Sequence, residues 1–112
     1  MSQITTVNAA DAPSGELNQK YLVAGSDVAM RMWHDEKAGK AGTAHKRDYE
    51  TVGYVISGKV ELTIDGETIT LGAGDSWHVP RGAERSYRIR EMLTAIEATT
   101  PAARDGNDTR SV

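Results

Sequence analysis

The chain has 112 residues, no cysteine and a formal net charge of −3 at neutral pH. This length is typical of one domain with one hydrophobic core. The small negative charge argues against general electrostatic binding to nucleic acid or to an anionic membrane, and the lack of cysteine excludes disulfides and thiolate chemistry. The sequence has no basic and apolar signal segment at its start, and no apolar run is long enough to span a membrane. We therefore expect a soluble cytoplasmic domain.

The two ends of the chain differ in composition from its middle. Residues 1–15 are mostly small and polar, which predicts an N-terminal arm. Residues 99–112 are also polar and predict a mobile C-terminal tail. The folded domain is therefore expected over residues 16–98.

Short segments in which apolar and polar residues alternate predict β-strands. In the first of these, residues 28–35, Met32 and His34 belong to the more apolar face, which we expect to point inward. Residues 36–43 predict a loop. Residues 51–57 predict a strand that is buried on both faces, because this segment is rich in residues that favour strands.

The dipeptide Asp65-Gly66 is the strongest hairpin signal in the chain, because it lies between two alternating runs and favours a type I′ turn. Trp77 and Val79 follow on one face of the next strand, which ends at residues 80–82. A last strand is expected over residues 92–98. Many short strands without a helical periodicity predict an all-β sandwich or barrel.

Arg85 lies on the apolar face of a predicted strand, together with Tyr87 and Ile89. The pattern therefore aims a guanidinium group inward, where an unpaired charge is strongly destabilising. Arg85 then needs an acidic partner, an anionic ligand or water. The alternative is a solvated position at the mouth of the fold, in which Arg85 pairs with Asp48 or Glu50.

Other aromatic and imidazole side chains have less specific patterns. We expect Tyr54 in the core or in a pocket wall, whereas Tyr49 and Trp33 suit an interface equally well. His78 alternates with Trp77, so it is expected to be exposed or at a subunit interface.

Two segments carry a characteristic spacing of glycine and proline. The first, HKRDYETVGYVISG at residues 45–58, ends in a glycine, and the second, GDSWHVPRGAERSY at residues 74–87, contains a glycine followed by Pro-x-Gly. In this spacing the chain resembles small single-domain members of the cupin superfamily. The resemblance implies a small jelly-roll β-barrel and a homodimer. The residues that carry it are Gly58, Gly74, Pro80 and Gly82.

The cupin motifs imply three histidines and a carboxylate as the ligands of a metal ion. In this chain His45 stands at the first histidine, and Thr51 stands at the carboxylate. Arg47 and Arg85 stand at the other two histidines. Arginine keeps its proton and has no lone pair to donate, so these guanidinium groups would repel a cation. We therefore expect no metal cofactor at these positions.

The same replacements favour an anionic ligand. We predict that the barrel binds a small organic anion, such as a sugar acid, a keto acid or a phosphorylated metabolite, through Arg47, Arg85 and His45. The predicted ligand-binding residues, including the expected walls of the site, are Met32, His34, His45, Arg47, Thr51, Trp77, Arg85 and Tyr87.

A shifted alignment of the first motif leaves a second interpretation open. If His45 is the second histidine, Glu50 takes the place of the carboxylate. His34, His45 and Glu50 then form a 2-His-1-carboxylate set, which suits one divalent ion such as Fe, Mn, Ni or Zn. In this interpretation the protein is a metal-dependent dioxygenase, isomerase or sugar-acid-processing enzyme. The sequence leaves open whether the protein is an enzyme.

Overall fold

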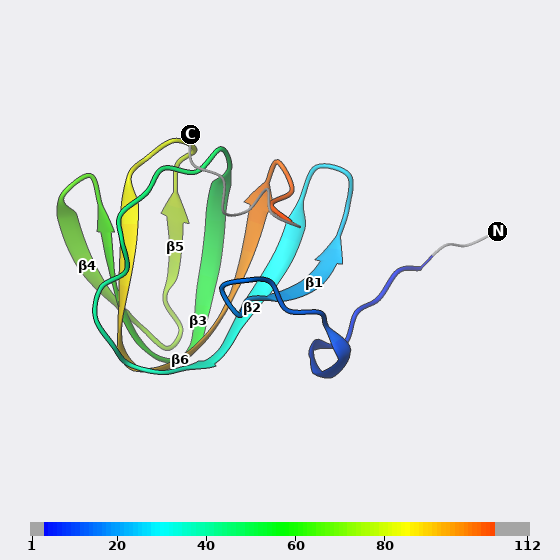
Figure 1. Ribbon diagram of the computed structural model, residues 1–112, viewed down its shortest axis with the longest axis horizontal. Helices are drawn as coiled ribbons and strands as arrows, with labels where there is room; N and C mark the ends of the chain where they lie inside the picture. The colour runs from blue at the N-terminus through cyan, green and yellow to red at the C-terminus, as the bar shows by residue number, and fades with distance from the viewer. Residues whose placement is uncertain (1–3, 105–112) are drawn as a thin grey trace.

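The computed structural model describes residues 4–104 and shows an antiparallel β-fold (Figure 1). The only helical segment in this range is a single 3₁₀ turn. No helix among these residues has the length and apolar character needed to cross a membrane, and the cytoplasmic location stays a prediction. The elements are η1 (Ala9–Asp11), β1 (Lys20–Ala24), β2 (Ala29–Glu36), β3 (Glu50–Ile64), β4 (Glu67–Gly72), β5 (Ser76–Val79) and β6 (Arg85–Thr100).

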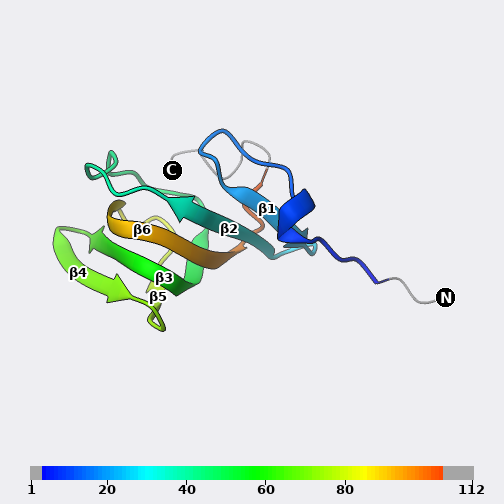
Figure 2. The same cartoon turned by 90° about the horizontal axis from the view of Figure 1, so that it is seen from below.

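The strands form one sheet in the order β1-β2-β6-β3-β4, and β5 pairs with β3 outside this order. Figure 2 shows β1 and β2 on one side of the long strands β6 and β3, and β4 on the other. β3 and β6 pair along most of their length, and their register shifts around Gly58. Here the sheet folds back on itself, so that the halves of both strands belong to two facing layers. The predicted all-β jelly-roll barrel is confirmed.

Gly58 lies at the bend of β3. Its φ is +93°, and a Cβ atom at this position would collide with the carbonyl oxygen of Met92 on β6. Glycine tolerates this backbone conformation and has no side chain to clash. The closing glycine of the first motif therefore allows the two long strands to bend together and close the barrel.

The hairpin predicted at Asp65-Gly66 is confirmed. Both residues have positive φ angles, +47° and +85°, as a type I′ turn requires. Ile64 pairs with Glu67 directly across the turn. The resulting register places the buried side chain of Val60 opposite the buried side chain of Leu71.

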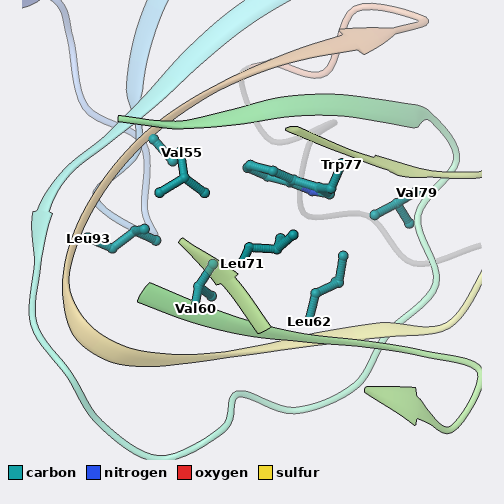
Figure 3. Packing of buried hydrophobic residues seen from close by; sticks show 8 residues of the cluster. Val55, Val60, Leu62, Leu71, Trp77, Val79 and Leu93 are labelled. Carbon is teal, nitrogen blue, oxygen red and sulfur yellow. The ribbon is translucent and has the colours of Figure 1, made fainter. Parts of the chain in front are cut away.

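Apolar side chains from both layers fill the space between them. Trp77 and Val79 of β5 point inward as predicted, with 9% and 0% of their surface exposed. Figure 3 shows them across from Val60 and Leu62, which belong to the other half of the barrel. The core cluster consists of Val55, Val60, Leu62, Leu71, Trp77, Val79, Leu93 and Ala95.

The outer face of the first half of β3 is not covered. Val52, Tyr54 and Ile56 are 46% to 52% exposed. The prediction that residues 51–57 are buried on both faces is therefore wrong, as is the core position of Tyr54. A high content of β-branched and aromatic residues indicates a strand, but it does not determine which faces are covered. The homodimer implied by the resemblance stays a prediction.

Both ends of the described chain contact the barrel. Lys20 Nζ donates a hydrogen bond to the carbonyl oxygen of Ala9, which ties the N-terminal arm to β1. Thr99 and Thr100 are the last residues of β6, so this strand extends into the segment that we assigned to the tail. Residues 105–112 of that tail lie outside the described residues.

Candidate functional site

A cavity of about 120 Å³ lies between the two layers of the barrel. Its walls are mainly apolar and aromatic, and they include one pair of opposite charges. β6 lines the cavity with both of its halves, because the strand bends around the core. The lining residues are Arg31 and Trp33 of β2, Val60 of β3, Trp77 of β5, and Tyr87, Ile89, Leu93, Ala95 and Glu97 of β6.

Arg31 and Glu97 form a buried ion pair in the cavity wall. They face each other on the neighbouring strands β2 and β6, and Arg31 Nε lies 3.0 Å from Glu97 Oε1. The indole N–H of Trp33 donates to the same oxygen. Only 8% of Arg31 and 3% of Glu97 is exposed. Glu97 depends on this pair, because removal of Arg31 would leave a buried carboxylate without its cation.

The two carboxylate oxygens of Glu97, Oε1 and Oε2, differ in their hydrogen-bond partners. Both hydrogen bonds from Arg31 and Trp33 go to Oε1. Within residues 4–104, no side chain or backbone group donates a hydrogen bond to Oε2. Glu97 therefore brings to the cavity wall a buried acceptor atom that has no hydrogen-bond donor among the described residues.

The hydroxyl group of Tyr87 belongs to the same wall. It accepts a hydrogen bond of 3.3 Å from Trp77 Nε1, and the two rings pack edge to face with their centres 6.4 Å apart. Burial, followed by the negative charge of Glu97, raises the pKa of Tyr87. The hydroxyl group therefore keeps its proton at neutral pH and is able to donate. Trp77 and Tyr87 are thus the two predicted ligand-binding residues that line the cavity.

Tyr49 connects the ion pair to a second guanidinium group. Arg31 Nη2 donates to the Tyr49 hydroxyl group at 3.3 Å, and the guanidinium carbons of Arg31 and Arg85 lie 5.4 Å and 5.9 Å from the ring centre. Burial lowers the pKa of Arg31, but Glu97 and Tyr49 more than offset this effect, so the pKa is raised and Arg31 stays charged. Tyr49 is buried, so the interface position that we considered for it is wrong.

The three residues predicted to hold an anion lie near one another. His45 and Arg85 exchange backbone hydrogen bonds of 3.0 Å and 2.9 Å, and both Arg47 and Arg85 are buried. Burial, followed by the charges of Arg47 and Arg85, lowers the pKa of His45 below its usual value of 6.5. The imidazole is therefore neutral at pH 7, beside two positive charges.

Arg85 is buried as predicted. The alternative, a solvated position in which Arg85 pairs with Asp48 or Glu50, is wrong. Its Nε and Nη2 atoms donate to the backbone carbonyl oxygens of Ala83 and Pro80 at 3.0 Å and 3.2 Å. Asp48 and Glu50 pair with other side chains, and no carboxylate in the described range forms an ion pair with Arg85. The three residues predicted to hold the anion, and Thr51 among the other predicted ligand-binding residues, do not line the cavity.

The predicted inward face of β2 is wrong. Arg31 and Trp33 face the cavity, so Met32 and His34, on the alternate positions, do not line it. The side chain of His34 is 48% exposed. The more apolar face of this strand points outward because the interior accommodates Arg31 together with its partner Glu97.

The side chains at the motif positions do not fit a metal ion. Guanidinium groups occupy two of the four motif positions and cannot coordinate a cation. The alternative set of His34, His45 and Glu50 is not assembled, since His34 is exposed on β2 and Glu50 pairs with His78 at 2.6 Å. In the part of the chain that the structure describes, no three His, Asp or Glu side chains gather closely enough to hold an ion.

Replacement of Arg31 by methionine is expected to destabilise the fold by about 3 kcal/mol or more, because it leaves the Glu97 carboxylate buried without its cation. Lys59→Met is the matched control. Lys59 forms an exposed pair with Glu91 at 3.4 Å, and its replacement should change stability by only about 0.5 kcal/mol. Urea denaturation followed by circular dichroism measures both variants.

A double variant tests whether the unpaired charge of Glu97 causes this loss of stability. The double variant Arg31→Met/Glu97→Leu removes both charges, so it should recover most of the stability that Arg31→Met loses. Equal and small effects of Arg31→Met and Lys59→Met would contradict the importance of the buried pair.

Comparisons with known proteins agree with this architecture. Residues 31–96 match the family described as "Cupin domain". The chain is 32% identical over 98 residues to quercetin 2,3-dioxygenase of Bacillus subtilis (strain 168), which covers 88% of this chain but only 26% of that protein. It is 28% identical over 91 residues to the pectin degradation protein KdgF of Dickeya dadantii (strain 3937), which covers 80% of this chain and 82% of KdgF.

A solved structure has a similar fold. The RmlC-like cupin from Shewanella frigidimarina NCIMB 400 superimposes with a TM-score of 0.77 at 19% sequence identity, and the match covers 89% of this chain and 93% of that one. At this identity the likeness concerns the fold alone. On the family match, the motif spacing and the barrel architecture, the chain belongs to the cupin family.

Proposed function

We propose that the protein binds a small organic molecule with a single ring in the cavity of its barrel. The observation that carries this proposal is the cavity itself, which measures about 120 Å³ and is enclosed largely by apolar and aromatic side chains. An apolar protein cavity of roughly 150 Å³ holds benzene, whereas drug-sized ligands need roughly 300 Å³ or more. The volume therefore favours one ring over a larger ligand.

The aromatic walls suit such a ligand. Trp33, Trp77 and Tyr87 offer ring faces and edges for stacking, and each also carries a polar atom. The names of a quercetin dioxygenase and a pectin degradation protein among the relatives support a site for organic molecules in this fold. Because one fold hosts unrelated activities, these relatives do not identify the ligand.

A cavity-filling variant tests the proposal. Ala95→Leu places extra methyl groups in the cavity, because Ala95 lines it and is 1% exposed. Ala98→Leu is the matched control on the opposite face of the same strand. We expect phenol to bind the unaltered protein and Ala98→Leu equally, and to bind Ala95→Leu about tenfold or more weakly.

Tryptophan fluorescence measures this binding, because both tryptophans of the sequence, Trp33 and Trp77, line the cavity. Thermal unfolding shows whether each variant is folded. Equal loss of binding in both variants, or no saturable binding of phenol or toluene to the unaltered protein, would argue against the cavity as the site.

The arginines support a second candidate function, the binding of a small organic anion. Arg85 is buried with backbone carbonyl oxygens as its hydrogen-bond partners, near the positive charge of Arg47. Such a group favours a carboxylate or a phosphate as an additional partner. His45 is the reporter of this site, because the charges of both arginines contribute to its low pKa.

An NMR titration of the His45 imidazole tests the anion. In the free protein we expect His45 to titrate below pH 6.5. Its stability effect follows the same sign: the unfolded chain binds the proton more tightly, so stability falls as the pH drops below 6.5. A bound anion offsets the arginine charges, so pyruvate or glucose 6-phosphate should raise the pKa of His45. An unchanged titration at saturating concentrations of such anions rejects this candidate.

A further inference from the structure

We propose that the ligand of the cavity donates a hydrogen bond from a hydroxyl or amino group to Oε2 of Glu97. This inference rests on the proposed function and assigns a chemical class to the ligand of the same cavity. The class is a neutral ring compound with a hydroxyl or amino substituent, of which phenol and aniline are the simplest members.

The geometry of Glu97 supports this assignment. Its Oε1 atom accepts hydrogen bonds from Arg31 and Trp33, which hold the carboxylate in place. Its Oε2 atom has no donor within residues 4–104, although only 3% of the residue is exposed. A buried acceptor that lacks a partner is destabilising, and more so when it is charged. A ring that fills the cavity excludes water from Glu97, so the ligand itself has to supply the donor.

Tyr87 supplies the complementary interaction. Its hydroxyl group accepts from Trp77 Nε1, and within the described chain no acceptor receives its own proton. Tyr87 and Glu97 both line the cavity, so one ligand is able to contact both groups. A hydroxyl group on the ligand is able to donate to Glu97 and to accept from Tyr87. A carboxylate on the ligand would instead place a second negative charge near Glu97.

Phenol and toluene form a matched pair of probes for the unaltered protein. They have nearly the same shape, and toluene is the more hydrophobic of the two. An apolar cavity without a polar requirement therefore prefers toluene. A hydrogen bond to a buried carboxylate reverses this order, and we expect phenol to bind about tenfold or more tightly than toluene. Isothermal titration calorimetry and tryptophan fluorescence measure both affinities.

Glu97→Gln tests whether Glu97 is responsible. The amide oxygen still accepts from Arg31 and Trp33, so the amide NH₂ replaces Oε2 and turns an acceptor into a donor. We expect the preference for phenol over toluene to fall to about threefold or less. Benzaldehyde, which only accepts, should bind this variant about fivefold more tightly than it binds the unaltered protein. The matched control is Glu61→Gln, because Glu61 forms its ion pairs with Arg88 and Arg90 away from the cavity lining.

The outcomes separate this inference from the proposed function. If toluene binds the unaltered protein as tightly as phenol or more tightly, the donor requirement is wrong and the cavity remains a binding site. If neither probe binds, both proposals fail. An unchanged phenol preference in a folded Glu97→Gln variant also overturns the role of Glu97. If that variant does not fold, the comparison of phenol with toluene in the unaltered protein still tests whether the ligand has to donate a hydrogen bond.

Discussion

A carboxylate and a guanidinium group that face each other across β2 and β6 determine much of what this barrel is able to bind. Arg31 and Glu97 are buried together, and the carboxylate of Glu97 depends on the guanidinium group as its cation. Two donors occupy one oxygen of Glu97 and leave the other oxygen to the cavity. The otherwise largely apolar cavity thereby contains one strong hydrogen-bond acceptor. The shape of the cavity favours a ring, and this acceptor selects the polar group that the ring carries.

The bend in the two long strands brings these groups together. Gly58 allows β3 to turn back, and β6 follows it, so that Tyr87 from one half of β6 and Glu97 from the other line the same cavity. The motif positions that would hold a metal in the family carry Arg47 and Arg85 instead, and such side chains repel cations. Tyr49 packs against Arg85 and accepts a hydrogen bond from Arg31, so it connects one of these motif positions to the ion pair.

Local patterns in the sequence were sufficient for the fold and for part of the site. Asp65-Gly66 specifies its own turn through its backbone conformation, and the glycine and proline spacing carries the resemblance to cupins, which implies the barrel. Alternation correctly separates the two faces of β2, but it does not tell which face is inside. The face with Met32 is the more apolar, yet Arg31 is the buried residue. That outcome depends on Glu97, which is distant in sequence and becomes its neighbour only through the register of β2 with β6. A search for opposite charges at alternating positions of two predicted strands would have offered this pair as a candidate.

A crystal structure of the protein in complex with phenol tests the central claim most directly. Our account predicts that the ring lies inside the barrel against Trp77 and Tyr87, with its oxygen about 2.5–2.8 Å from Oε2 of Glu97. Phenol bound only outside the barrel would contradict this account. A ring inside the cavity with its hydroxyl group turned away from Glu97 would also contradict it.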